Sequence, residues 1–463
     1  MGLQNKIAQY RAYKRGVVHC TFNPEGPGVV RIHLIPPKFS LFKSSAYIVI
    51  LNGYYLLPIG YSFALVLSFF MREVNRYDGK PITKEDEAHI LHNTLRAVRA
   101  VYPTVSRESV REDLEEILDV LFAVARGEGK DLDIEKLSIR SYARHMSAPH
   151  RMDLMVSAMT TPEGNWKCNQ KCTFCYAAGE AKSSAPELDT EEWKRVIDRL
   201  IDARVPMLTF TGGEPTLRED IVELIGHAKR CVTRLNTNGI LLTEELTAAL
   251  KAAELDSVQV TLYSHDAGVH NALVGAARFE DTVRGIRNAV AAGLDVSVNT
   301  PLCKKNADYD KTLAFIRSLG VRFVTASGLI CTGTASVAHE EYDLGEGELL
   351  EIITAAKQYC DGVDMEIDFT SPGLIAREAL EALGMNVPAC GAALSNMAVA
   401  PDGEVIPCQS WLVASAGLGN ILQTDFKKIW NHKKCVALRE MSESDALACP
   451  FREGKGAGQY GEI

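Results

Sequence analysis

Three cysteines stand close together in the run Cys168-Asn169-Gln170-Lys171-Cys172-Thr173-Phe174-Cys175. Thiolates are soft ligands, and three of them in one short loop can hold zinc or an iron–sulfur cluster. Structural zinc needs a fourth ligand, commonly from a second C-x2-C pair, and no such pair is adjacent. Three ligands around a four-iron cluster leave one iron open. The triplet therefore predicts a metal centre at which chemistry takes place.

A second short motif, Thr211-Gly212-Gly213-Glu214-Pro215, also lies at the end of a β-rich segment. Two adjacent glycines let a backbone come close to a ligand at a strand end, and Glu214 adds a carboxylate there. The two motifs follow the segments Met152–Met159 and Met207–Phe210. Barrel enzymes place their chemistry at such carboxyl ends of strands, so both motifs are expected to meet in one site.

The C-x3-C-x2-C spacing, with Phe174 before the third cysteine, resembles the radical S-adenosylmethionine family, and the Gly-Gly-Glu-Pro element is similar to that family's second motif. The resemblance implies that Cys168, Cys172 and Cys175 hold a catalytic [4Fe-4S] cluster whose open iron binds S-adenosyl-L-methionine. An electron delivered to this cluster would yield methionine and a 5′-deoxyadenosyl radical, which takes a hydrogen atom from a substrate carbon. The resemblance implies cofactor contacts for Phe174, Gly212, Gly213, Glu214, Pro215, Thr237, Thr261 and Asn299.

Three of these contacts rest on weaker family-like segments that end later strands. Asn236-Thr237-Asn238-Gly239, Val260-Thr261-Leu262-Tyr263 and Val298-Asn299-Thr300 are similar to segments that contact the ribose and carboxylate of the cofactor. Each polar residue could equally be an ordinary strand-end group. Many relatives have Ser-Leu-Asp where this chain has Thr261-Leu262-Tyr263, so Tyr263 is left without an assigned role.

The elements that must position these motifs form a regular pattern over residues 150–335. Amphipathic helices alternate with six β-rich segments, which predicts parallel β-α units in a partial (βα)6 TIM-like barrel and an α/β fold. Asp189 and Glu192 predict a capped start for the first helix, Thr190–Ala203. The six expected strands are Met152–Met159, Met207–Phe210, Thr233–Thr237, Ser257–Tyr263, Asp295–Thr300 and Val321–Ser327.

Residues 345–463 are expected to form a hairpin-plus-helix iron–sulfur domain. Pro401-Asp402-Gly403 predicts a hairpin, and Cys390 and Cys408 flank it. The segment resembles the SPASM or twitch domains that follow many radical enzymes, and this implies one auxiliary [4Fe-4S] cluster held by Cys390, Cys408 and Cys449. Two readings of Cys435 stay open, because it is either the fourth ligand or a packed core residue.

Residues 1–130 are expected to form a separate α+β module of strands, a hairpin at Asn52-Gly53 and two amphipathic helices. The module loosely resembles the PqqD-like elements that recognise precursor peptides. Such elements bind a leader peptide by adding it as a strand to an exposed sheet edge. A plain structural domain is the alternative.

Charge and hydropathy exclude other classes of partner. The formal net charge of −9 argues against a basic nucleic-acid surface. Tyr47–Phe70 carries no charge and is long enough to span a membrane, but Asn52-Gly53, Pro58 and Gly60 interrupt it. We expect a hairpin and a buried helix there, and no membrane partner. The N-terminus has no apolar signal-peptide core, so a reducing, cytoplasmic location is expected.

The expected function is that of a radical enzyme acting on a ribosomally made precursor peptide, which it modifies oxidatively or crosslinks. The alternative is a radical dehydrogenase or cyclase for a small molecule, with the N-terminal module only structural. A non-catalytic iron–sulfur or zinc scaffold would leave Gly212 to Pro215 without a purpose. An external electron donor of flavodoxin or ferredoxin type is the other expected partner.

Overall fold

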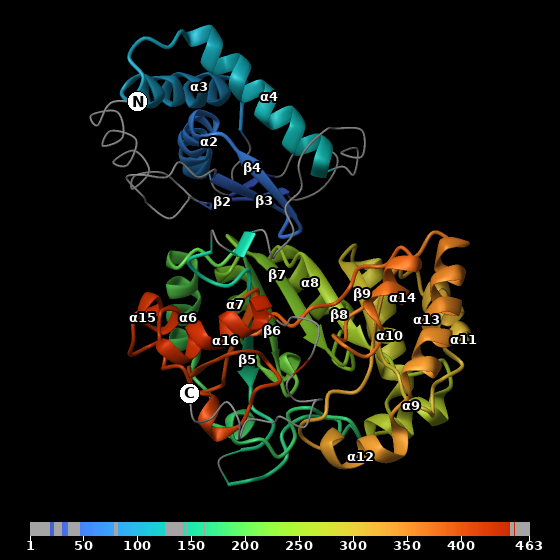
Figure 1. The fold of residues 1–463 in the computed structure, drawn as a ribbon. Coiled ribbons are helices and arrows are strands. Elements are labelled where there is room, and N and C mark those ends of the chain that lie inside the picture. Colours follow the sequence, from blue (N-terminus) through green and yellow to red (C-terminus); the bar gives the residue numbers. More distant parts are fainter. Residues whose placement is uncertain are drawn as a thin grey trace. The chain divides into compact units, whose positions relative to one another are not determined.

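The computed structural model describes residues 19–22, 30–35, 47–77, 82–125, 142–143, 146–161, 163–444 and 449. The chain divides into two compact units (Figure 1). The N-terminal unit comprises Met1–His150 with two short pieces, Arg204–Pro206 and Arg230–Val232, and the barrel unit comprises the rest.

The N-terminal unit has a four-stranded antiparallel sheet in the order β1-β2-β3-β4. The predicted hairpin is present, although Tyr54 belongs to the turn because Leu51 pairs with Tyr55. Asn52 and Gly53 have φ of 51° and 70°, as a tight hairpin turn requires. The elements are β1 (His19–Phe22), β2 (Val30–Ile35), β3 (Tyr47–Leu51), β4 (Tyr55–Ile59), α2 (Tyr61–Val74), η1 (Asn75–Tyr77), α3 (Lys84–Arg99) and α4 (Arg107–Ala125).

Helix α2 is apolar around most of its circumference because it packs on both sides. Ala64 and Leu67 lie in the core formed with the sheet, whereas Val66 and Phe69 lie in a second core with α3 and α4. A helix buried on both sides needs no polar face. This position explains the uncharged run in the sequence, and no helix among the described residues is long and apolar enough to cross a membrane.

The barrel unit contains a nine-stranded sheet in the order β11-β10-β9-β8-β7-β6-β5-β12-β13. Its central six strands follow chain order, which confirms the predicted α/β fold with a partial barrel. The six are β5 (Arg151–Ser157), β6 (Met207–Gly212), β7 (Val232–Thr237), β8 (Ser257–Thr261), β9 (Asp295–Pro301) and β10 (Phe323–Ser327).

Three further strands extend this sheet beyond the predicted six. Strand β11 (Glu366–Phe369) pairs in parallel with β10, and β12 (Asn396–Val399) pairs in parallel with β5. Strand β13 (Val405–Ile406) completes the predicted hairpin with β12. The C-terminal hairpin is therefore part of the barrel sheet, next to the strand that leads into the three-cysteine loop.

Helices cover one face of this sheet (Figure 1), and strands β8 and β9 each have one buried and one more exposed face. Along β8 and β9, buried Val258, Val260 and Val298 alternate with the partly exposed Gln259 and Asn299. The helices and short 3-10 turns are η3 (Ala181–Ser184), α6 (Thr190–Asp202), η4 (Pro215–Leu217), α7 (Ile221–His227), α8 (Glu244–Ala252), α9 (Ala267–Val274), α10 (Phe279–Ala291), α11 (Tyr309–Ser318), α12 (Ala335–Tyr342), α13 (Glu346–Asp361), α14 (Arg377–Ala382), η5 (Ala414–Ala416), α15 (Phe426–Trp430) and α16 (Lys433–Ser444).

Helix α6 begins with the predicted capping arrangement. The Glu192 amide donates to Asp189 Oδ1 at 2.7 Å, and the Asp189 amide donates to Glu192 Oε2 at 3.1 Å. Trp193, Val196 and Ile197 are fully buried on its inner face. The cap and the apolar stripe together fix where the helix starts and which side meets the sheet.

Candidate radical site

The three cysteines of the first motif lie in the loop that follows β5, and their thiols are close enough to influence one another. Burial, together with the charges of Glu214 and Cys175, raises the pKa of Cys168 to about 12. Burial, Cys175 and Cys168 likewise raise the pKa of Cys172 well above its usual range. A bound metal centre would supply the positive charge that favours the thiolate form of these partly buried groups.

This donor set fits the iron–sulfur cluster that the sequence predicts, because all three groups are soft thiols on one short loop. Across the described stretches of the chain, no three His, Cys, Asp or Glu side chains are arranged to hold a metal ion. The assignment of Cys168, Cys172 and Cys175 as cluster ligands stays a prediction, and it rests on their spacing and shared burial.

Main-chain hydrogen bonds fix this cysteine loop to its surroundings. The Lys171 amide donates to Val274 O at 3.0 Å, and the Thr173 amide donates to Leu273 O at 2.9 Å. Within the loop, Trp166 Nε1 donates to Gln170 O at 2.8 Å. The loop therefore has a defined shape before any ligand is considered.

The segment Ile330–Ala335, which follows β10, holds the far side of the same loop. The Cys175 amide donates to Thr334 Oγ1 at 3.1 Å, and the Thr334 amide donates to Cys175 O at 3.0 Å. Gly333 has φ of 59°, and a Cβ there would lie 2.2 Å from Cys175 O. We call this segment the clasp. The clasp was not predicted from the sequence, although Gly333, between two threonines a few residues after the last expected strand, was a visible signal.

The second motif comes close to the start of the cysteine loop. The Gly213 amide donates to Ser157 O at 2.8 Å, and the Cys168 thiol donates to Gly213 O at 3.6 Å. Gly212 has φ of 137°, and a Cβ on it would lie 2.3 Å from Ser157 O. The glycines are thus required for the approach of β6 to the end of β5. This structural role is additional to the ligand contact expected from the sequence.

Glu214 is a buried hydrogen-bond acceptor that joins the ends of β6 and β7. Its Oε1 accepts from the Thr216 amide at 3.1 Å, the Thr216 hydroxyl at 2.5 Å and the Thr237 hydroxyl at 2.6 Å. Its Oε2 accepts only the Asn238 amide, at 2.8 Å, among the described residues. Burial raises the pKa of Glu214, and these hydrogen bonds act in the opposite direction. Oε2 therefore has room for one more donor, such as an ammonium group.

Thr261 and Asn299 lie opposite each other on β8 and β9, on the partly exposed polar face. Asn299 Oδ1 accepts from the Thr325 hydroxyl at 2.8 Å, which in turn accepts from Gln259 Nε2 at 3.3 Å. Thr237 instead lies beside Glu214 and supports its carboxylate. Pro215 is buried and begins the short turn that carries the Thr216 amide. Cofactor contacts by these residues stay predictions.

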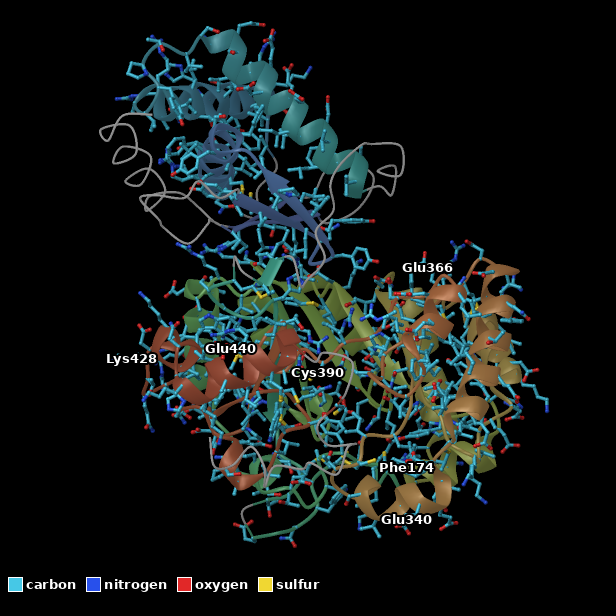
Figure 2. All side chains as sticks on the ribbon, in the orientation of Figure 1. Phe174, Glu340, Glu366, Cys390, Lys428 and Glu440 are labelled. Atoms are coloured by element: carbon cyan, nitrogen blue, oxygen red, sulfur yellow. The ribbon has the colours of Figure 1, made fainter. Side chains whose placement is uncertain are left out.

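Phe174 and Tyr263 pack into one apolar cluster under the cysteine loop. Their ring centroids are 6.3 Å apart, and Tyr342 of α12 meets Phe174 edge-on at 5.2 Å. Phe174 lies on one side of α12 and Glu340 on the other (Figure 2). Tyr263, left without a role by the sequence, therefore serves as packing for the cysteine loop. The position of Phe174 gives it the same role, alongside the predicted cofactor contact.

His270 of α9 meets the Tyr263 ring of this cluster edge-on. It makes a pH-dependent contribution to stability. It is fully buried, and burial lowers its pKa to about 4. Protonation therefore favours the unfolded chain as pH falls below about 6.5, the ordinary histidine value. We expect the free energy of unfolding to fall by about 1.4 kcal/mol per pH unit from this residue between pH 6.5 and 4. Urea unfolding of parent and His270→Leu at pH 7 and pH 5 measures it, since other groups cancel in the comparison. Equal pH dependence of the two proteins would contradict the assignment.

A second group of thiols forms around Cys408. Burial raises the pKa of Cys408 well above its usual range, and Cys390 and Cys449 raise it further, so the three lie near one another. Cys390 lies beside α16 (Figure 2), where Ser442 Oγ is 4.0 Å from its sulfur. Cys390 and Cys449 are thus near enough to Cys408 for their charges to act on its thiol. Their role as ligands stays a prediction.

Cys435 occupies a different environment on α16. It is fully buried, and its sulfur accepts from Arg439 Nη1 at 3.9 Å. Arg439 also stacks on the Trp430 ring, with 3.8 Å from its Cζ to the ring centroid. Burial raises the pKa of Cys435 to about 11, and Arg439 acts against this rise. These contacts favour the packing reading of Cys435 over the ligand reading.

Tyr176 lies between the two groups of thiols and was not singled out from the sequence. Burial raises its pKa, and the charges of Cys175, Asp153 and Cys408 add to the rise. Asp153 is itself buried on β5 and pairs with Arg151 Nε at 2.9 Å. The visible signal was a tyrosine directly after the third cysteine and a lone carboxylate in the first barrel strand. One cysteine of each site, Cys175 and Cys408, therefore acts on the pKa of the same tyrosine.

Two segments of the chain match known protein families. Residues 167–316 match the Radical SAM superfamily, and residues 390–450 match the SPASM iron-sulfur cluster-binding domain. The PqqA peptide cyclase of Granulibacter bethesdensis is 28% identical over 53% of this chain and 65% of its own length, just under two thirds. The Fe-coproporphyrin III synthase of Methanosarcina barkeri is 29% identical over 57% of this chain and 71% of its own length.

The fold also resembles a solved structure, that of Streptococcus suis SuiB bound to precursor peptide SuiA. The TM-score is 0.57 with 14% sequence identity, and the match covers 89% of this chain and 93% of that chain. At this identity the likeness concerns the fold. It extends over most of the chain, including segments outside the two matched domains.

Proposed function

The chain belongs to the radical SAM superfamily and carries a SPASM domain, and on that premise we propose that it oxidatively modifies or crosslinks a ribosomally made precursor peptide. Cys168, Cys172 and Cys175 would hold the catalytic [4Fe-4S] cluster, and Cys390, Cys408 and Cys449 an auxiliary one. When reduced and bound to S-adenosylmethionine, the first cluster supplies a 5′-deoxyadenosyl radical that takes a hydrogen atom from a substrate carbon.

The chain's own residues bind and orient the reactants. Glu214 Oε2 keeps one acceptor position beside the Asn238 amide, where it can receive the methionine ammonium group. Phe174 and Tyr263 close the underside of the cysteine loop with apolar surface. The polar side chains of Thr261 and Asn299, on adjacent strands, are proposed to contact the ribose and carboxylate. Together they would fix the cofactor and keep water from beneath the loop.

The observation that carries the proposal is that Cys175 and Cys408, one from each group of thiols, both act on the pKa of Tyr176. Oxidation of a substrate radical needs an electron acceptor close to where the radical forms. PqqA peptide cyclase and SuiB, by their names, act on or bind peptides. In the described part of the N-terminal unit, β1 and β4 are the outer strands of an antiparallel sheet. We propose that a leader peptide adds to one of these edges.

The test is an anaerobic reaction of the full-length, reconstituted protein with S-adenosylmethionine, a flavodoxin or ferredoxin as the external donor, and the peptide encoded beside the gene. We expect the peptide to lose hydrogen, which mass spectrometry detects as a decrease in its mass. We also expect 5′-deoxyadenosine to form. A protein lacking residues 1–130 should still form 5′-deoxyadenosine without peptide but lose peptide modification. Its iron content must match the parent, because deletion can expose apolar surface.

A second candidate function is radical chemistry on a small molecule. The likeness to Fe-coproporphyrin III synthase, whose name refers to a tetrapyrrole, favours it. The same deletion distinguishes the two. An enzyme that lacks residues 1–130 and carries the parent's iron content is the decisive sample. If it processed its substrate at the full-length rate, peptide recognition by the N-terminal unit would be contradicted and a small-molecule substrate favoured.

A further inference from the structure

Gln170, inside the cysteine loop, has a buried side-chain amide beside a predicted cluster ligand. The residue is 5% exposed, and its Oε1 lies 3.5 Å from the Cys172 sulfur, from which it accepts the thiol hydrogen. Its Nε2 has no hydrogen-bond partner among the described residues. A hydrogen bond holds its main chain in place, because Gln170 O accepts from Trp166 Nε1 at 2.8 Å. The amide is therefore held next to Cys172 with one end unsatisfied.

A buried N–H without a partner is energetically unfavourable, so this orientation needs an explanation. A protonated Cys172 donates its hydrogen and therefore faces the amide oxygen. A thiolate bound to iron has no hydrogen and can only accept. A half turn about the last side-chain bond exchanges the oxygen and nitrogen of a carboxamide with almost no change in shape. In the metal-bound state the N–H then faces the sulfur.

We propose that Gln170 donates an N–H···S hydrogen bond to the Cys172 sulfur when that sulfur binds iron, and thereby raises the reduction potential of the cluster. The inference rests on the proposed function. A donor to a cluster sulfur stabilises the reduced cluster more than the oxidised one, because reduction adds negative charge.

The experiment compares full-length, reconstituted parent protein with Gln170→Leu and Gln170→Met, which remove the amide at similar size. Gln358→Leu is the matched control, because Gln358 is exposed on α13. Potentiometric titration followed by electron paramagnetic resonance measures the cluster whose signal changes on addition of S-adenosylmethionine. We expect the ratio of reduced to oxidised cluster at a fixed potential to fall about tenfold in both Gln170 variants, a shift of about 59 mV to more negative potential. Gln358→Leu should match the parent.

A vibrational readout tests the hydrogen bond itself. Iron–sulfur stretching bands of the parent should shift when exchangeable hydrogens are replaced by deuterium, and this shift should shrink in the Gln170 variants. Unchanged potentials and unchanged deuterium sensitivity in the variants would overturn the proposal for Gln170 alone. A parent protein that binds no iron responsive to S-adenosylmethionine would instead overturn the proposed function. If Gln170→Leu does not load iron, Gln170→Met carries the comparison.

Discussion

A variant with alanine in place of Cys168, Cys172 and Cys175 is expected to cleave no S-adenosylmethionine and to keep about half of the parent's iron. Two four-iron clusters give about eight irons per parent chain. Removing all ligands of one leaves about four, since Cys390, Cys408 and Cys449 are the proposed ligands of the other cluster. Iron analysis and chromatographic measurement of 5′-deoxyadenosine give both values in one preparation.

The matched control replaces Cys231 and Cys360, which are buried singly and lie outside both thiol groups, by alanine. This double variant should keep the full iron content and the parent rate of cofactor cleavage. Stoichiometric zinc in the parent, without iron or its visible absorbance, would remove the radical assignment altogether.

Glu214→Gln is expected to weaken the binding of S-adenosylmethionine about tenfold to a hundredfold without changing iron content. The carboxylate is the proposed acceptor for the methionine ammonium group, and a hydrogen bond to a charged partner contributes roughly 1.5–3 kcal/mol. The glutamine side chain also carries N–H donors. These would face the groups of Thr216, Thr237 and Asn238 that donate to the carboxylate in the parent protein. Equilibrium dialysis with labelled cofactor measures the effect.

Thr216→Val separates the two contributions to this loss. It removes one donor to Oε1 but leaves the carboxylate and its Oε2 in place. Affinity for the cofactor should fall less in this variant than in Glu214→Gln. Parent affinity in Glu214→Gln would mean that the carboxylate only joins β6 to β7.

Local patterns were sufficient to predict the six central strands and most of their helices. The alternation along Ser257–Thr261 and the Asp189–Glu192 cap are encoded within a few residues. The membership of β11, β12 and β13 in the same sheet was not predictable in this way. Strand β12 pairs Asn396 with Arg151, and nothing in either segment alone specifies so distant a partner.

The residues of the candidate site also divide into those that a local pattern predicts and those that depend on distant contacts. Spacing identified Cys168 to Cys175 and Gly212 to Pro215, because those residues are neighbours in the chain. The polar surroundings of Tyr176 and the amide of Gln170 depend on which strands meet, so no local pattern predicts them. Tyr263 departed from the family pattern, and its explanation is tertiary packing against Phe174.

The clasp has a consequence for the order in which the molecule is assembled. Thr334 bonds the Cys175 amide across 159 positions of the chain, so the cysteine loop acquires its full support only after the sixth barrel strand has joined the sheet. Contacts of such long sequence separation form at a high cost in chain entropy and slow the folding step that makes them. A nascent chain can therefore have all three cysteines and still lack the finished loop. Iron would therefore be inserted late in folding, after β10 has joined the sheet and the clasp has met the cysteine loop.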